Sequence, residues 1–74
     1  MSMSGRQMDN FLRANPEIAP NYLADGHWER RAIAVRYAPL DAVRALLHDP
    51  DEVVRRVVAT RLPPQELLQM RRDV

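Results

Sequence analysis

The sequence predicts an all-α protein, built as a short solenoid from about three repeats of 24 residues with two short helices in each. Three observations support this prediction. When the chain is shifted against itself by one repeat length, Asp25 aligns with Asp49 and Arg31 aligns with Arg55. Prolines divide the chain into short segments, and within these segments the apolar residues follow a helical spacing. We therefore expect one domain over residues 1–74, with repeat units at approximately 1–24, 25–48 and 49–74.

The first unit is predicted to begin with a helix over roughly residues 5–14. Ser4 and Gln7 have the spacing of a capping box, in which each side chain bonds the backbone amide of the other residue. Met8 and Leu12 lie one helical turn apart and form an apolar face together with Phe11. The prolines at positions 16 and 20 then restrict the next stretch to short or 3₁₀-like turns.

The second and third units follow the same plan. In the second, a helix is expected to start at Asp25-Gly26, to end before Pro39, and to be followed by a short helix over residues 40–48. In the third, Asp49 is the predicted N-cap, because proline follows at the first helical position and Glu52 completes a capping box. The helical stripe of this segment comprises Val53, Val54, Val57, Val58 and Leu62, and Pro63-Pro64 opens a last helix over 65–72.

Composition excludes several classes of site. There are no cysteines, so disulfides, thiolate-bound zinc, cysteine-ligated iron–sulfur clusters and cysteine nucleophiles are ruled out. The net charge of +1 gives no electrostatic footprint for nucleic acid or an anionic membrane. No apolar stretch approaches the roughly 20 residues of a membrane helix, and the polar start of the sequence lacks the apolar centre of a signal peptide. We expect a soluble, cytoplasmic protein.

Residues suited to catalysis are scarce. The two histidines, His27 and His48, stand far apart in the sequence and lack the spacing of metal ligands. Besides the tyrosines, hydroxyl groups occur only at Ser2, Ser4 and Thr60, and two glycines cannot make a glycine-rich phosphate loop. We predict that the protein is not an enzyme and has no catalytic residues, metal site or cofactor.

The third unit carries a family resemblance. Its Asp49-Pro50-Asp51, Val54-Arg55 and Val58-Ala59, followed by Pro63 and Leu67-Leu68, resemble the repeat unit of the bacterial leucine-rich repeat variant family, with plain HEAT-like repeats as the nearest alternative. The second unit departs from that pattern at Gly26-His27-Trp28.

This resemblance implies a right-handed superhelix in which α-helices alternate with 3₁₀ or short α-helices. Some family members carry a cysteine-bound iron–sulfur cluster ahead of the repeats, which a chain without cysteine cannot hold. The family has no common catalytic activity to transfer.

A structural ladder of charged residues is expected between adjacent units. Arg31 and Arg55 each follow an aspartate, Asp25 and Asp49, at the same spacing. In HEAT-like stacks a repeated arginine and aspartate commonly pair from one unit to the next, and a partly buried bidentate pair is favourable. The alternative is a row of guanidinium groups that face a phosphate or carboxylate partner.

These observations favour a non-enzymatic module that binds another protein or a second copy of itself, because a solenoid unit cannot bury its apolar face alone. The alternative is a weak nucleic-acid-binding module with an arginine-rich surface. The residues predicted to contribute to a partner surface are Trp28, Arg44, Arg61, Leu67, Leu68, Met70 and Arg71.

Overall fold

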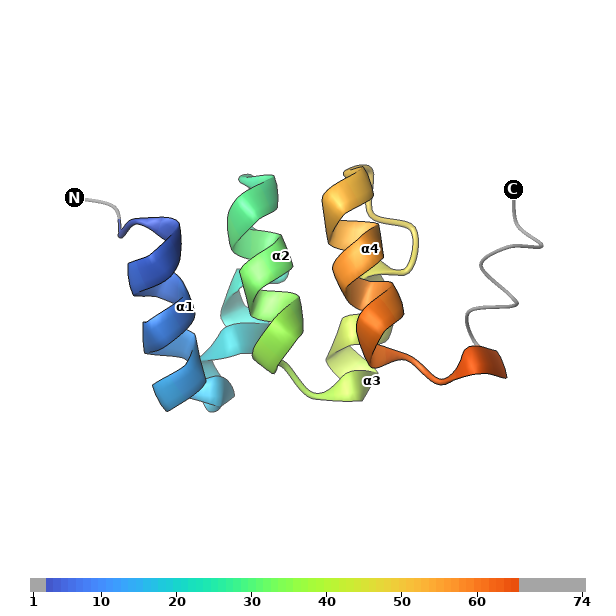
Figure 1. Cartoon of the computed structure of the whole chain (residues 1–74), viewed down its shortest axis with the longest axis horizontal. Coiled ribbons are helices and arrows are strands. Elements are labelled where there is room, and N and C mark those ends of the chain that lie inside the picture. The colour runs from blue at the N-terminus through green and yellow to red at the C-terminus, as the bar shows by residue number, and fades with distance from the viewer. Residues whose placement is uncertain (1–2, 66–74) are drawn as a thin grey trace.

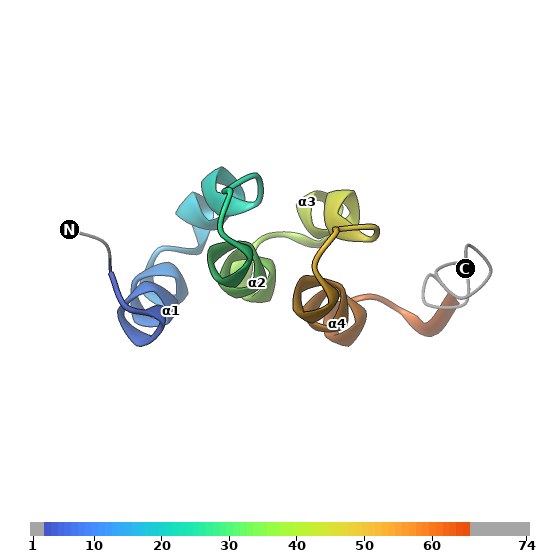
Figure 2. The ribbon, with the colours of Figure 1, turned by 90° about the horizontal axis from the view of Figure 1, so that it is seen from above.

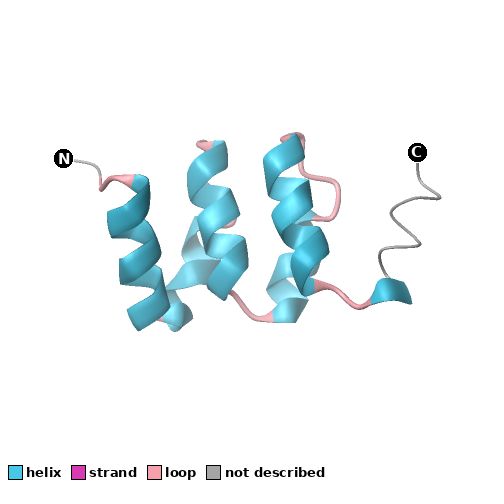
Figure 3. Cartoon of the chain, in the orientation of Figure 1, coloured by secondary structure: helices cyan, strands magenta, loops and turns pink. Residues whose placement is uncertain are grey.

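The computed structural model describes residues 3–65, and all regular structure in that part of the chain is helical (Figure 3). The first helix, α1, spans Gly5–Ala14 as the sequence predicts. Ser4 Oγ accepts a hydrogen bond from the Gln7 amide at 3.2 Å, and Gln7 Oε1 accepts one from the Ser4 amide at 2.9 Å. The capping box is confirmed, and it satisfies amides that the first helical turn leaves without partners.

The short second helices also agree with the proline pattern. A 3₁₀ helix, η1, spans Pro16–Tyr22, and one repeat later the α-helix α3 (Leu40–Val43) continues into the 3₁₀ helix η2 (Arg44–Leu46). Both segments bury a residue at the same place, Ala19 in η1 and Val43 in α3, each fully inaccessible. The predicted second helix over 40–48 is therefore too long, because η2 ends at Leu46.

The longer helices of the second and third units are offset by one repeat. The second, α2, spans Trp28–Tyr37, and α4 spans Glu52–Arg61, so the two helices start and end at equivalent repeat positions. Their predicted starts are wrong, because His27 and Asp51 provide the N-caps in place of Asp25 and Asp49. The two aspartates instead accept hydrogen bonds from the amides two residues ahead, which is the geometry of an Asx turn.

The helices form two layers (Figures 1 and 2). The helices α1, α2 and α4 lie side by side and run in the same direction, and we call them the α layer. The short segments η1 and α3–η2 make up the second layer. The core lies between the layers and contains the buried residues Met8, Leu12, Ala19, Leu23, Ala32, Ile33, Ala34, Val35, Ala38, Val43, Val54, Val58 and Leu62.

The valine-rich segment of the third unit shows why spacing outweighs intrinsic strand preference. Val54 and Val58 are fully buried and Leu62 is 6 % exposed, so one helical stripe enters the core. Val53 is the exception within the predicted stripe, since 42 % of its surface is exposed. It lies in the first turn of α4 beside the fully buried Val54, but outside the stripe of Val54, Val58 and Leu62 that recurs every four residues.

Candidate functional site

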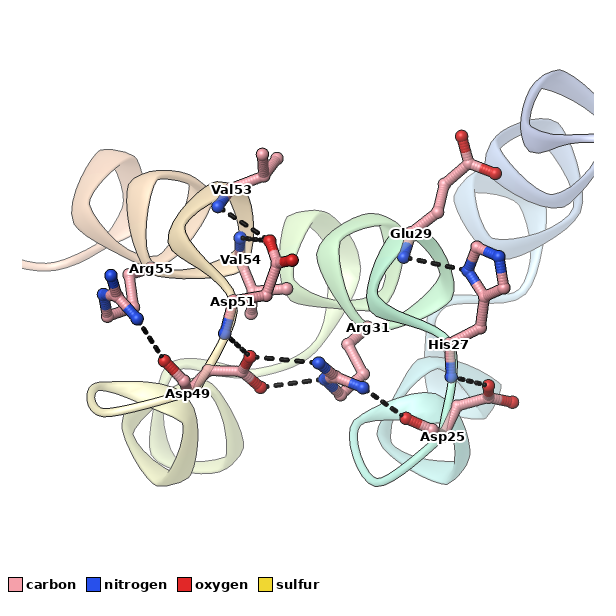
Figure 4. A network of polar contacts seen from close by, with 9 residues as sticks. All are labelled: Asp25, His27, Glu29, Arg31, Asp49, Asp51, Val53, Val54 and Arg55. Carbon is pink, nitrogen blue, oxygen red and sulfur yellow. Dashed lines mark hydrogen bonds and ion pairs between the residues drawn. The ribbon is translucent and has the colours of Figure 1, made fainter.

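Arg31 makes three hydrogen bonds, two of which link the second unit to the third (Figure 4). Its Nε donates to Asp49 Oδ2 at 2.8 Å and its Nη2 donates to Asp49 Oδ1 at 3.1 Å, a bidentate pair. The third bond runs from Nη1 to the backbone carbonyl of Asp25 at 2.8 Å. One guanidinium group therefore joins the loop before its own helix, α2, to the loop before α4.

We call this contact of Arg31 with Asp49 a rung of the ladder. Asp49 lies at its centre, with only 2 % of its side chain exposed. Its Oδ1 also accepts from the Asp51 amide at 2.9 Å, and its backbone carbonyl accepts from Arg55 Nη1 at 2.6 Å. Burial by itself would raise the pKa of this carboxyl. The Arg31 hydrogen bond, the Asp51 amide and the charges of Arg31 and Arg55 outweigh burial and lower that pKa.

Asp25, which is equivalent to Asp49 one repeat earlier, makes only some of the corresponding contacts within the described residues. Asp25 Oδ1 accepts from the His27 amide at 2.8 Å, and its carbonyl accepts from Arg31, as the carbonyl of Asp49 accepts from Arg55. However, among residues 3–65 its carboxylate forms an ion pair with Arg30 alone, at the longer distance of 3.6 Å. The residue one repeat before Arg31 is Gln7, whose side chain is held in the capping box of α1. The structure thus places all four predicted ladder residues together but completes one rung within residues 3–65.

We expect Arg55→Ala to lower stability more than Arg56→Ala. Arg55 is half-buried and bonds the Asp49 carbonyl, so its removal should cost about 1–2 kcal/mol. Arg56 is 74 % exposed in its side chain and pairs with the exposed Glu52, so its removal should cost under about 0.5 kcal/mol. Urea unfolding measures both values, and equal losses would contradict the assignment of Arg55 to the ladder.

Two of the predicted partner-surface arginines have partners within the protein. Arg61 Nη1 reaches back from the last turn of α4 and donates to the carbonyls of Val35 and Ala38, at 2.6 and 2.8 Å. This half-buried side chain closes the C-terminal end of α2, so it does not present a free cation as predicted. Arg44 is exposed, and its Nη1 lies 2.5 Å from Asp41 Oδ1. The remaining predicted residues, Leu67, Leu68, Met70 and Arg71, lie outside the described residues.

An open groove of about 500 Å³ crosses the α layer. All three helices of the layer contribute residues to the lining of the groove. Figure 2 shows α2 between α1 and α4, slightly nearer to the second layer than its two neighbours. Ala32 and Ile33 of α2 and Val57 of α4 contribute the apolar part. The charged part consists of Arg6, Asp9, Glu29 and Arg36, and Gly5 completes the lining. The sequence analysis did not identify this groove, although the lining residues of α2 follow a helical spacing.

A polar contact fixes the two helices on one side of the groove. Tyr37 of α2 donates its hydroxyl hydrogen to Asp9 Oδ2 of α1 at 2.8 Å, and Arg36 Nη1 lies 3.0 Å from Asp9 Oδ1. Burial, and then the hydrogen bond and charge of Asp9, raise the pKa of Tyr37. In contrast, the side chains of Arg6 and Glu29 make no ion pair with any residue in 3–65. The groove therefore carries one cation and one anion that are open to a ligand.

Trp28 lies at the start of α2 with 41 % of its surface exposed. Its ring stacks on His27, with the ring centroids 6.1 Å apart. Beside it is a shallow hollow of about 260 Å³, lined also by Gly26, Arg31, Pro50 and Asp51. The predicted partner residue Trp28 is thus accessible, between the loops that precede α2 and α4.

His27 and Asp51 play the same capping role in successive repeats and can be compared directly. His27 Nδ1 accepts one amide bond at 3.2 Å, whereas Asp51 Oδ1 accepts from Val53 and Val54 at 2.8 and 3.4 Å. We expect His27→Asp to stabilise the protein by about 0.5–1 kcal/mol, because a carboxylate suits the positive end of a helix. Thermal unfolding should show a higher Tm for His27→Asp and, as the control, a lower Tm for His27→Ala. An unchanged Tm in both variants would show that the His27 side chain does not stabilise α2 as its N-cap.

Within the described part, no cluster of three or more histidine, cysteine, aspartate or glutamate residues could hold a metal ion. No helix in residues 3–65 is long and apolar enough to cross a membrane.

Comparison with known proteins agrees with this architecture. A model of the leucine rich repeat variant family matches residues 28–51, a segment that runs from the start of α2 to the cap of α4. No curated protein matches the chain. A solved structure, described as a leucine-rich repeat variant with a novel repetitive protein structural motif, is 59 % identical with a TM-score of 0.84. That match covers 93 % of this chain and 29 % of the other, so the chain spans under a third of its relative. The chain belongs to the leucine-rich repeat variant family.

Proposed function

We propose that this structural repeat module binds a partner protein in the groove of the α layer, and that the bound segment is an amphipathic helix. The observation that carries the proposal is the groove itself, which combines an apolar floor from α2 and α4 with charged residues from α1 and α2. Ligand and helix sites of this kind join an apolar contact face to a few polar groups that fix orientation.

The shape of the groove favours a helix. The groove follows α2 for two turns, from Glu29 to Arg36, with the small residue Ala32 between them. A short side chain at this position lets a second helix approach closely, and packed helices prefer interaxial distances of about 8–10 Å. The apolar stripe of the partner helix would lie on Ile33 and Val57.

The unpaired charges of the groove define the partner further. Arg6 lies on α1 and Glu29 on α2, and both belong to the first turn of their helices. A partner helix with an acidic residue on one side of its apolar stripe and a basic residue on the other would neutralise both. Such pairing contributes mainly to specificity and to the association rate.

A site-specific crosslink tests this proposal. The photoreactive residue p-benzoylphenylalanine would replace Arg6, which lines the groove, or Arg13, which is exposed in the last turn of the same helix and lies outside the groove lining. We expect one protein to be crosslinked from position 6 and none from position 13. With that protein purified, Arg6→Glu should weaken binding about tenfold and Arg13→Glu should leave it unchanged.

Equal crosslinking from both positions, or an unchanged Kd for Arg6→Glu, would overturn the proposal. A crosslink to a second copy of the chain would also overturn it, since the occupant would then be the chain itself. Sedimentation equilibrium of the unmodified protein separates that case, because it reports a dimer directly.

Nucleic-acid binding is expected to be weak and sensitive to salt. Five arginines in residues 3–65 lie within 4 Å of a carboxylate: Arg30, Arg31, Arg36, Arg44 and Arg56. Since each phosphate contact needs an available cation and steepens the salt dependence, few contacts can form. Fluorescence anisotropy with labelled duplex and single-stranded oligonucleotides at about 50 and 200 mM salt measures this. Submicromolar binding at the higher salt would contradict the expectation and favour the nucleic-acid alternative.

A further inference from the structure

We infer that the hollow beside Trp28 binds a cationic side chain, arginine or lysine, from a basic segment of a partner protein. This site is separate from the groove of the α layer: of the residues that line the hollow, none lines the groove. It therefore does not depend on the function proposed above.

The first observation is a local departure from the repeat. Residues 25–28, Asp-Gly-His-Trp, align with residues 49–52, Asp-Pro-Asp-Glu, and the backbone turns are the same. The second unit lacks the proline that would stiffen this turn, and its helix is capped by a histidine with one bond instead of an aspartate with two. It also places an indole where the third unit has an exposed glutamate. Each change lowers the local stability of the start of α2 relative to the start of α4. Sequence changes that lower local stability are typical of functional positions.

The second observation is the chemistry of the hollow. The rings of Trp28 and Pro50 provide apolar walls, and Asp51 provides a carboxylate. Asp51 Oδ1 bonds the amides of α4, but Oδ2 accepts no hydrogen bond from the described residues.

The third observation is that the cations around the hollow are already neutralised. Arg31 lines the hollow but forms the bidentate pair with Asp49, and Arg30 lies 3.6 Å from Asp25. Of the two charged residues that line the hollow, Asp51 is therefore the one without an ion pair in residues 3–65, and it is anionic. An arriving guanidinium or ammonium could lie over the indole face that is not stacked on His27 and pair with Asp51 at the same time. Tryptophan gives the strongest cation–π attraction among the aromatic side chains.

Tryptophan fluorescence tests this inference, because Trp28 is the only tryptophan in the chain. The probe is a hexa-arginine peptide, with a hexaglutamate peptide as the control of opposite charge. We expect hexa-arginine to change the emission in a saturable way and hexaglutamate to leave it unchanged. Asp51→Asn, which keeps a capping oxygen, should weaken hexa-arginine binding about threefold to fivefold.

The matched control is Glu52→Gln. Glu52 is an exposed carboxylate one residue further along, and it pairs with Arg56 and does not line the hollow. Binding of hexa-arginine to this variant should stay within about twofold of the unmodified protein. A labelled hexa-arginine peptide, followed by anisotropy, should bind Trp28→Ala at least about fivefold more weakly. Equal loss in Glu52→Gln and Asp51→Asn, or unchanged binding to Trp28→Ala, would overturn the inference.

Discussion

Asp49→Ala is expected to lower the free energy of unfolding by about 3 kcal/mol, because it leaves the guanidinium group of Arg31 partly buried without its bidentate partner. The same change removes the acceptor for the Asp51 amide and so loosens the turn that leads into α4. Urea unfolding monitored by circular dichroism measures the loss. Asp49→Asn should fall between the alanine variant and the unmodified protein, since it keeps an oxygen for the turn.

The matched control for this prediction is Asp25→Ala. Asp25 has the same place in the preceding repeat, but its carboxylate accepts from the His27 amide and, within residues 3–65, forms an ion pair with Arg30 alone at 3.6 Å. We expect its loss to be less than half of that for Asp49. Equal losses would mean that the bidentate bond across the repeats contributes little.

The contribution of Asp49 should depend on pH in a defined direction. Because the pKa of Asp49 is lowered in the folded protein, its stabilising contribution is present above the unfolded pKa and is lost as the pH falls through the folded pKa. The difference in unfolding free energy between the unmodified protein and Asp49→Asn should therefore be largest near neutral pH and shrink below about pH 4. A difference that grows on acidification would contradict the ion pair.

Arg61→Ala is expected to cost about 2 kcal/mol, although Arg61 has no carboxylate partner among the described residues. One of its amino groups donates to two backbone carbonyls at the end of α2. When partly buried carbonyls at a helix end lose a charged donor, the folded protein loses stability because these carbonyls have no hydrogen-bond partner within the helix. For a domain of this size the loss corresponds to a fall in Tm of roughly 8–16 °C. Differential scanning calorimetry measures it.

Arg61→Lys is the informative companion, because a lysine ammonium can donate to a carbonyl but lacks the planar fork of arginine. It should recover part of the lost stability, while exposed Arg56→Ala should change the Tm little. If Arg61→Ala were as mild as Arg56→Ala, the contact of α4 with the end of α2 would not stabilise the repeat stack.

Local signals predicted much of the fold. The Ser4 capping box and the prolines at 16 and 39 marked where helices begin and end, and the spacing of Val54 and Val58 identified a helix despite their preference for strands. The helix starts predicted at Asp25 and Asp49 were wrong, because each precedes the observed cap by two positions. An Asx turn and an N-cap both favour an aspartate before a helix, and only the three-dimensional position of Arg31 shows which aspartate serves which role.

The candidate site was harder to predict for the same reason. The repeat spacing predicted Arg31 and Asp49 as ladder residues, because an arginine and an aspartate recur at these repeat positions. Arg61 was interpreted as a surface cation because its carbonyl partners, Val35 and Ala38, lie 26 and 23 residues away and carry no side-chain signal. The groove likewise depends on how three helices are set relative to one another, which no single segment encodes.

NMR chemical-shift mapping tests most directly whether a partner binds on the α layer. The partner crosslinked at position 6 would be added to the isotopically labelled protein, and the backbone amide shifts would be followed. We predict the largest changes at groove residues of all three helices, including Arg6, Glu29, Ala32 and Val57. Changes confined to the second layer, at residues 16–22 and 40–46, would contradict the account.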